Sequence, residues 1–367
     1  ANLQAGRGGA CTAYYSCFDP EAEVIAVLQN PRTPRDRQNR DIHFCVQFNK
    51  LFAKKVARGE DIFTFNIKSH PKLMELFFSG DTDAFENEYE RVGQEERNTL
   101  NWVNARARFL LMAQQSYDVG THYYMFIDEA NRHTPFKETI YLSNLCTEIV
   151  EPTKPYKNMV DLYSDNHEEG EVALCNLAAI NVAAIESEAE YAEAMYNALK
   201  MIDKTIHQAH YQLPHVGYTA KQRMNAGVGI IGLAYYLAKR GLTYTSVEGL
   251  REIHRVAERH LYHAISASLR LGRELGNAPW MHKTKWPEGW LPIDTYKKAV
   301  DEIAEPVYFY DWEKLRAEVV ANGGIRNSCL IAHMPTESSS KASSVPNGVY
   351  PIRDLSLKKT DRSTVIS

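Results

Sequence analysis

An amide, a thiol and a carboxylate occupy every second position in one short stretch of the chain. Asn144, Cys146 and Glu148 alternate there with Leu145 and Thr147. In an extended segment, residues two apart point to the same face, so the three polar side chains would share one side. A straight strand would hold the outer two about 13 Å apart, at roughly 3.3 Å per residue. One small substrate could contact all three only if the segment bends, as at the tip of a loop.

Two further segments carry side chains that could take part in chemistry. Cys175 lies in the sequence Ala-Leu-Cys-Asn-Leu, 29 residues after Cys146, and residues 334–340 read Met-Pro-Thr-Glu-Ser-Ser-Ser. Taken singly, a lone cysteine is usually a small buried apolar residue, and a Ser-rich turn is usually a solvated loop. The three segments together, in this order, resemble the large catalytic subunit of ribonucleotide reductase. The resemblance is closest to the aerobic class that acts on ribonucleoside diphosphates.

The resemblance implies a radical mechanism centred on Cys146. Its thiol would become a thiyl radical and remove the 3′ hydrogen atom of the ribose, which no acid–base group can do. Glu148 would take the proton of the 3′-hydroxyl as a positioned base, and Asn144 would hold substrate hydroxyls. A radical needs shielding from water, so the family's burial of this cysteine inside a barrel is expected here.

The resemblance also implies a reducing role for Cys175. Loss of the 2′-hydroxyl as water needs two electrons, which two thiols supply by closing to a disulfide. The family's partner cysteine lies upstream of the region where this chain begins, and Cys11, Cys17 and Cys45 do not match its position. We interpret these three and Cys329 as structural.

A phosphate-binding segment is expected near the end of the chain. Hydroxyls and unpaired backbone N–H groups at a helix start suit a diphosphate, and the family binds its substrate diphosphate in this Ser-rich stretch. With the neighbours of Cys146 included, the expected substrate-binding residues are Ser143, Asn144, Glu148, Thr336, Glu337, Ser338, Ser339 and Ser340.

Composition excludes several functional classes. Charged residues make up 24% of the 367 residues and the net charge is −4, so no basic surface for nucleic acid is expected. The longest apolar run, residues 226–238, is too short to span a bilayer, and the first residues lack the apolar core of a signal peptide. Six cysteines without a Cys-x-x-Cys pair favour reducing cytosol over a secreted disulfide framework.

No metal or nucleotide cofactor is expected on this chain. The di-iron motif Glu-x-x-His is absent from the sequence, so the radical would come from a metal-containing small (beta) subunit, with thioredoxin or glutaredoxin as external reductant. Residues 227–232 read Gly-x-Gly-x-x-Gly, but no buried strand is predicted before them, so we interpret these glycines as sites of close helix packing. The tyrosine pairs at 14–15, 123–124 and 235–236 are interpreted as core.

Alternating strand and helix patterns predict an α/β fold with parallel strand pairing. Strands are expected at 11–18, 41–48, 62–67, 123–127, 174–185 and 328–334. Helices are expected at 19–28, 49–58, 86–118, 190–209, 233–240, 250–275 and 312–321. The resemblance implies one catalytic domain over residues 1–367, an incomplete ten-stranded α/β barrel of the ribonucleotide reductase and glycyl-radical type, with Cys146 on an inner loop.

The parts of the family's large subunit that this chain does not match indicate the expected partners. The N-terminal nucleotide-binding regions and the C-terminal tail of the family are expected on complementary segments, and the complete subunit is expected to be a homodimer. One alternative is a cobalamin-dependent reductase, which shares Asn-x-Cys-x-Glu; another is a non-catalytic fragment that docks with a complementary chain. The glycyl-radical class typically lacks a glutamate at the position of Glu148.

Overall fold

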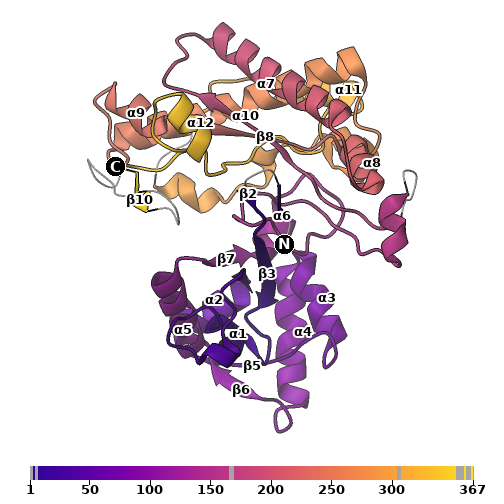
Figure 1. Cartoon of the computed structure of the whole chain (residues 1–367), viewed down its shortest axis with the longest axis vertical. Helices are drawn as coiled ribbons and strands as arrows, with labels where there is room; N and C mark the ends of the chain where they lie inside the picture. Colours follow the sequence, from indigo (N-terminus) through magenta and orange to yellow (C-terminus); the bar gives the residue numbers. More distant parts are fainter. Residues whose placement is uncertain are drawn as a thin grey trace. The chain divides into compact units, whose positions relative to one another are not determined.

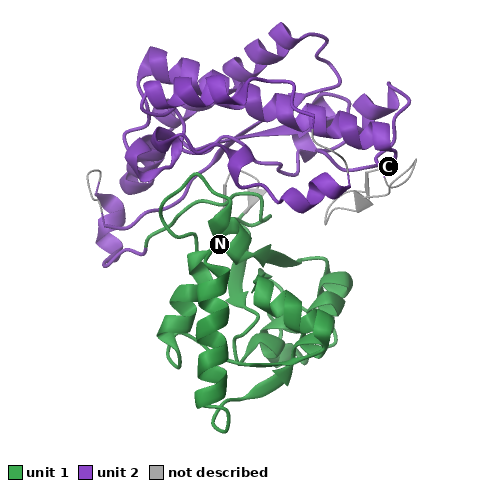
Figure 2. Cartoon of the chain, turned by 180° about the vertical axis from the view of Figure 1, so that it is seen from behind, with its two compact units in different colours: residues 1–154 green, residues 155–367 purple. Residues whose placement is uncertain are grey.

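The computed structural model describes residues 3–4, 7–164, 169–303, 307–352, 359–360 and 365–366. The chain divides into two compact units, Ala1–Lys154 and Pro155–Ser367 (Figure 2). None of the helices in the described residues is long and apolar enough to cross a membrane.

A three-stranded parallel sheet forms the centre of the first unit (Figure 1). Its strands, in spatial order, are β3 (Cys11–Ser16), β4 (Ile42–Phe48) and β7 (His122–Phe126). Both neighbours of β4 run parallel to it, and Phe44 lies opposite Ala13 on one side and His122 on the other. Every residue of β4 from Phe44 to Phe48 is buried. The strand is therefore covered on both faces, as parallel sheets usually are.

Helices and a small antiparallel pair surround this sheet. The helices are α1 (Ala22–Ala26), α2 (Lys50–Arg58), α3 (Pro71–Ser79), α4 (Thr82–Glu95), α5 (Ala105–Val119) and α6 (Ile127–Arg132). The pair is β5 (Asp61–Phe63) with β6 (Trp102–Asn104). Two-residue strands β1 (Leu3–Gln4) and β2 (Arg7–Gly8) also pair, and a 3-10 turn covers Arg35–Arg37.

The continuous helix predicted for residues 86–118 was wrong. Two helices occupy this region, and β6 separates them because Val103 pairs with Ile62 of β5. The side chain of Asn104 then accepts a hydrogen bond of 3.1 Å from the backbone N–H of Ala107 and begins α5. The helical periodicity on both sides of β6 gave no indication of this strand, because its pairing partner β5 lies about forty residues earlier in the sequence.

A two-stranded parallel sheet extended by one bridge forms the centre of the second unit. Strands β8 (Asn176–Asn181) and β9 (Ala226–Ile231) pair with Asn176 opposite Ala226. On its other side β9 meets the segment after residue 328: the N–H groups of Ala226 and Val228 donate to the carbonyls of Cys329 and Leu330, at 3.2 and 2.8 Å. The strand predicted at 328–334 is therefore reduced to one parallel bridge, between Val228 and Ile331.

The helices predicted at 190–209, 233–240, 250–275 and 312–321 are confirmed in the second unit, whereas the helix at 214–223 was not predicted. The helices of this unit are α7 (Glu188–Gln208), α8 (Pro214–Arg223), α9 (Leu233–Ala238), α10 (Val247–Leu275), α11 (Trp312–Ala321) and α12 (Glu337–Ala342). The apolar face predicted for α7 is confirmed, because its five members are all buried: Tyr191, Met195, Leu199, Ile202 and Ile206. Short 3-10 turns cover Met159–Tyr163, Met281–Lys283, Trp286–Glu288, Pro292–Asp294 and Lys298–Glu302. Strands β10 (Lys359–Thr360) and β11 (Val365–Ile366) pair with each other.

The Gly-x-Gly-x-x-Gly sequence has a different role from the helix packing predicted for it. Gly227 and Gly229 lie inside the buried strand β9, where an added Cβ would meet Ala332 and neighbouring side chains at under 3 Å. Gly232 precedes α9 with a φ of +78°, a conformation that glycine adopts without strain. The glycines therefore permit close approach within the sheet, and no dinucleotide motif is formed.

The α/β class and the parallel pairing are confirmed, but no closed barrel is present in the described part of the chain. Its sheets contain two or three strands each, and β5 pairs with β6 in the antiparallel sense.

Candidate active site

The segment from Asn144 to Glu148 forms a turn and not a straight strand. The N–H of Thr147 lies 3.4 Å from the carbonyl oxygen of Asn144. Thr147 has a φ of +64°, which is uncommon for a β-branched residue. Cys146 is exposed at the tip of this turn. The described residues therefore do not bury the Cys146 thiol, which was expected to lie inside a barrel.

The side chains of Ser143 and Asn144 brace this turn from within. Asn144 Oδ1 accepts hydrogen bonds from the N–H of Ile149 at 3.0 Å and from Ser143 Oγ at 3.3 Å. Ser143 is buried, and its hydroxyl also donates to the carbonyl of Ile149. Both residues were expected to bind substrate, but here they close the base of the turn that carries Cys146.

Side chains from the central sheet of the first unit hold the turn in place. Thr12 and Tyr14, two apart on β3, donate from their hydroxyls to the carbonyls of Leu145 and Asn144, at 3.1 and 2.5 Å. Gln47 on β4 donates to the carbonyl of Tyr141 at 2.6 Å. The backbone on the N-terminal side of Cys146 is thus fixed by groups more than ninety residues away in sequence.

Two tyrosines near this turn are held neutral. Burial raises the pKa of Tyr14 well above its usual value, and the negative forms of Cys45, Glu148 and Cys146 add to the shift. Burial also raises the pKa of Tyr123, with a further contribution from Cys146. Both side chains are only partly buried. The prediction that the paired tyrosines are core residues was therefore wrong for these two, which lie beside the turn as neutral hydroxyl groups. It was also wrong for Tyr235, which is 47% exposed, whereas Tyr15 and Tyr236 are buried.

Glu148 carries an oxygen that lacks a hydrogen-bond partner. Its Oε2 atom is buried and has no such partner among the described residues. Buried polar atoms are hydrogen-bonded in the large majority of cases, so an exception calls for a specific explanation. A ligand hydroxyl is one group that could complete this oxygen's hydrogen bonding.

Tyr14→Phe is expected to loosen the turn without unfolding the protein. The change removes one side-chain hydrogen bond to the carbonyl of Asn144, which is worth about 0.5–1.5 kcal/mol. The free energy of unfolding should fall by about that amount, and Cys146 should react faster with iodoacetamide. The control is Tyr117→Phe, because Tyr117 is 87% exposed. Equal alkylation rates in the two variants would show that Tyr14 does not hold the turn.

The cysteines interpreted as structural fall into two groups. Cys17 and Cys45 are fully buried, and burial raises the pKa of Cys45 to about 12. These two fill the core, as predicted. Cys11 is exposed at the start of β3 and lies outside the core formed by the described residues, so its structural role stays a prediction.

Cys175 lies immediately before β8 in the second unit, and a second sulfur lies close to it. The Sγ atoms of Cys175 and Cys329 are within 4.8 Å of each other. Cys329 was interpreted as structural because the sequence gives no sign of this proximity. Only the strand order could have predicted that Cys329 lies near Cys175. It places both cysteines at the same end of the sheet, on either side of β9.

The Ser-rich segment begins the six-residue helix α12, as predicted, but its hydroxyl groups differ in their roles. Thr336 is buried, and both its N–H and its hydroxyl donate to Asn347 Oδ1, at 2.7 and 2.9 Å. Ser340 is buried, with its hydroxyl on the carbonyl of Glu337 at 3.2 Å. Glu337, Ser338 and Ser339 are exposed. Thr336 and Ser340 therefore shape the segment, and the three residues between them are accessible.

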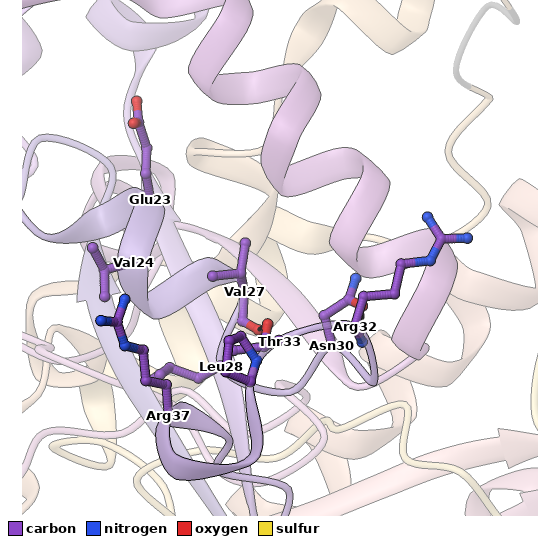
Figure 3. Close-up of a pocket in the computed structure, with 9 residues that line it drawn as sticks. Glu23, Val24, Val27, Leu28, Asn30, Arg32, Thr33 and Arg37 are labelled. Atoms are coloured by element: carbon purple, nitrogen blue, oxygen red, sulfur yellow. Dashed lines mark hydrogen bonds between the residues drawn. The ribbon is translucent and has the colours of Figure 1, made fainter.

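A depression of about 520 Å³ lies elsewhere on the first unit (Figure 3). Its walls come from α1 and the turn that follows, and they are formed by Glu23, Val24, Val27, Leu28, Asn30, Arg32, Thr33, Pro34 and Arg37. None of these residues belongs to the turn around Cys146, so this depression is not part of the candidate active site.

Comparisons with known proteins identify the family. The family model "Ribonucleotide reductase, barrel domain" matches residues 1–366. The chain belongs to the ribonucleotide reductase family, and the resemblance seen in the sequence is confirmed.

Several curated relatives are between 34% and 37% identical to this chain in amino-acid sequence. The ribonucleoside-diphosphate reductase subunit alpha of Haemophilus influenzae is 37% identical over 350 residues, which is 95% of this chain and 45% of the relative. Subunit alpha of ribonucleoside-diphosphate reductase 1 of Escherichia coli is 37% identical over 363 residues, or 98% of this chain and 47% of the relative. The subunit alpha of Enterobacteria phage T4 is 34% identical over 357 residues. The chain thus spans about half the length of the curated relatives it matches.

Proposed function

We propose that this chain is the catalytic part of a large subunit that reduces ribonucleoside diphosphates to 2′-deoxyribonucleoside diphosphates. The observation that carries the proposal is the braced turn of the first unit. It presents the Cys146 thiol at its tip and places Glu148 two residues further on, with one carboxylate oxygen that has no hydrogen-bond partner within the described part of the chain. The family match and the names of the relatives support the same conclusion.

The reacting groups act in sequence in the proposed reaction. The Cys146 thiyl radical takes the 3′ hydrogen atom of the ribose, while Glu148 takes the proton of the 3′-hydroxyl. The 2′-hydroxyl then leaves as water, and Cys175 with a second thiol supplies two electrons by forming a disulfide. Cys146 finally returns the hydrogen atom to C3′. One diphosphate and two thiols thereby give one deoxy product, one disulfide and one water.

The hydrogen bonds around the turn support this assignment. A group that removes a hydrogen atom must be held within a fraction of an ångström of its target. The bonds from Thr12 and Tyr14 fix the backbone before Cys146, and the bond between Asn144 and Ile149 closes the turn behind Glu148. We propose that Asn144 also presents its amide N–H groups to substrate hydroxyls, because the bonds described above engage only its Oδ1.

The proposal requires parts beyond the described sheets. We propose that the remaining segments of a complete large subunit finish the ten-stranded barrel as one domain and enclose the Cys146 turn, and that complete subunits form a homodimer. A separate metal-containing small subunit would supply the radical. Thioredoxin or glutaredoxin would reduce the disulfide after each turnover.

We propose that the substrate diphosphate binds at Glu337, Ser338 and Ser339. Their exposure leaves hydroxyl and backbone groups accessible, and the bonds from Thr336 to Asn347 hold the start of the segment rigidly. Thr336 and Ser340 would then act by positioning the binding groups.

Glu148→Gln tests the proposed proton acceptor. In a complete large subunit with its radical-generating partner, kcat should fall by about 10²–10⁴-fold, because a positioned general base contributes that much. The neutral amide still fits the site, so KM should change little. Deoxyribonucleotide formation by chromatography gives both constants.

The matched control is Glu75→Gln, which removes an exposed carboxylate on α3 of the same unit. It should leave kcat unchanged. Equal activity in the Glu75 and Glu148 variants would remove Glu148 from the mechanism.

The cobalamin-dependent alternative has less support, because the relatives described above are named ribonucleoside-diphosphate reductase subunit alpha. Activity that needs the small subunit and is unaffected by cobalamin would support the proposed class. Activity that depends on added cobalamin would overturn it.

A further inference from the structure

We propose that Cys175 and Cys329 form a dithiol that peroxide converts to an intramolecular disulfide within the second unit. Their Sγ atoms lie within 4.8 Å of each other, and both cysteines are in the thiol form. This inference does not rest on the proposed function, because it concerns only the chemistry of two neighbouring sulfur atoms.

The strand order explains why two cysteines so far apart in sequence meet. Cys175 directly precedes β8, and Cys329 begins the segment that bonds to the opposite edge of β9. In a regular sheet the outer strands would be about 9.6 Å apart, twice the usual spacing of roughly 4.8 Å. The sulfur atoms are much closer than that, so both side chains must lean over the middle strand.

Glycine on the middle strand makes this approach possible. A Cβ atom added at Gly227 would lie 3.0 Å from the Sγ of Cys175. From the other side, the Sγ of Cys329 lies 3.5 Å from the carbonyl oxygen of Ala226. The space that a side chain at position 227 would occupy is thus left open beside the Cys175 sulfur.

Closure to a disulfide requires a moderate further movement. An S–S bond is about 2.05 Å long and needs Cα atoms about 4.4–6.8 Å apart, so the two segments must shift toward each other and the side chains must change rotamer. Both cysteines lie outside the regular strands: β8 begins at Asn176, and the bridge of the third segment is at Ile331. Cys175 precedes the first paired residue of β8, whereas the carbonyl of Cys329 accepts a hydrogen bond of 3.2 Å from the N–H of Ala226. The segment that carries Cys175 is therefore the one expected to move.

The reaction balances with hydrogen peroxide as the oxidant. Peroxide oxidises one of the two sulfurs to a sulfenic acid and releases water; the other thiol attacks that sulfur, forms the S–S bond and releases a second water. Two thiols and one peroxide thus give one disulfide and two waters. If the proposed function holds, this disulfide withholds Cys175 from ribose reduction until a dithiol reductant restores it.

Peptide mapping of the full chain tests the inference directly. The reduced chain is treated with one equivalent of hydrogen peroxide, blocked with N-ethylmaleimide, unfolded and digested with trypsin without reduction. Cys175 lies alone in the tryptic peptide 158–200 and Cys329 alone in 327–341. A mass corresponding to these two peptides joined, together with the loss of two thiols per chain, is the expected result.

Two variants sharpen the test. Cys329→Ser should abolish the joined peptide, whereas Cys11→Ser, which removes an exposed thiol of the first unit, should leave its yield unchanged. The result on the unmodified chain does not depend on whether either variant folds. Cys175 joined to any other cysteine, or both cysteines recovered as maleimide adducts while Cys11 is oxidised, would overturn the inference.

Discussion

Cys146→Ser is expected to lower deoxyribonucleotide formation by at least about 10⁴-fold in a complete large subunit supplied with its radical-generating partner. A serine hydroxyl cannot carry the unpaired electron that a sulfur atom carries, so the first hydrogen-atom transfer has no acceptor. Enzymes usually accelerate their reactions by 10⁶-fold or more, and loss of the group that starts the reaction should forfeit most of that gain. Turnover is measured as deoxyribonucleotide formed per subunit.

The control for this prediction is another exposed cysteine of the same unit. Cys11→Ser removes an exposed thiol at the start of β3 and should retain full activity. Near-UV circular dichroism of both variants reports whether tertiary packing survives. Substantial turnover by a folded Cys146→Ser variant would rule out the thiyl mechanism at this residue.

Glu171→Ala is expected to cost about 3–5 kcal/mol of the free energy of unfolding, which is typical when one partner of a buried ion pair is removed. Glu171 and Arg223 are both buried, and two hydrogen bonds of 2.7 and 2.9 Å join them. The remaining guanidinium would be left in the interior with its charge uncompensated. The carbonyl of Arg223 also accepts from the N–H of Ser328 at 3.1 Å, so the loss should spread to the segment that carries Cys329.

Urea denaturation followed by circular dichroism measures this loss. The matched control is Glu193→Ala on α7, which breaks the ion pair with Arg270 at 3.2 Å between side chains that are both more than half exposed. Exposed pairs contribute about 0–1 kcal/mol, so the control should change the stability little. Similar losses in the two variants would show that burial of the Glu171 pair does not determine its contribution.

Local sequence patterns predicted those elements whose burial follows a simple period. The apolar face of α7, the end of α10 at Gly276 and the strand at Tyr123 all appear close to their predicted positions. The patterns failed where a neighbour in space decides the conformation. Residues 97–104 were predicted as helix, but β6 within this range is a strand because it pairs with β5. Residues 328–334 were predicted as a strand, but they form a single bridge because they contact only one edge of β9.

The sequence alone identified the family, which is confirmed, and predicted the trio Asn144, Cys146 and Glu148, because both depend on residue types at fixed short spacings. Only the tertiary structure decided how that trio is held and which sulfur lies beside Cys175. The hydrogen bonds from Thr12 and Tyr14 to the turn join residues 133 and 130 positions apart in the sequence, respectively. The approach of Cys329 to Cys175 depends on strand order and on a glycine between them. Such contacts are set by the register and order of strands, which no local spacing encodes.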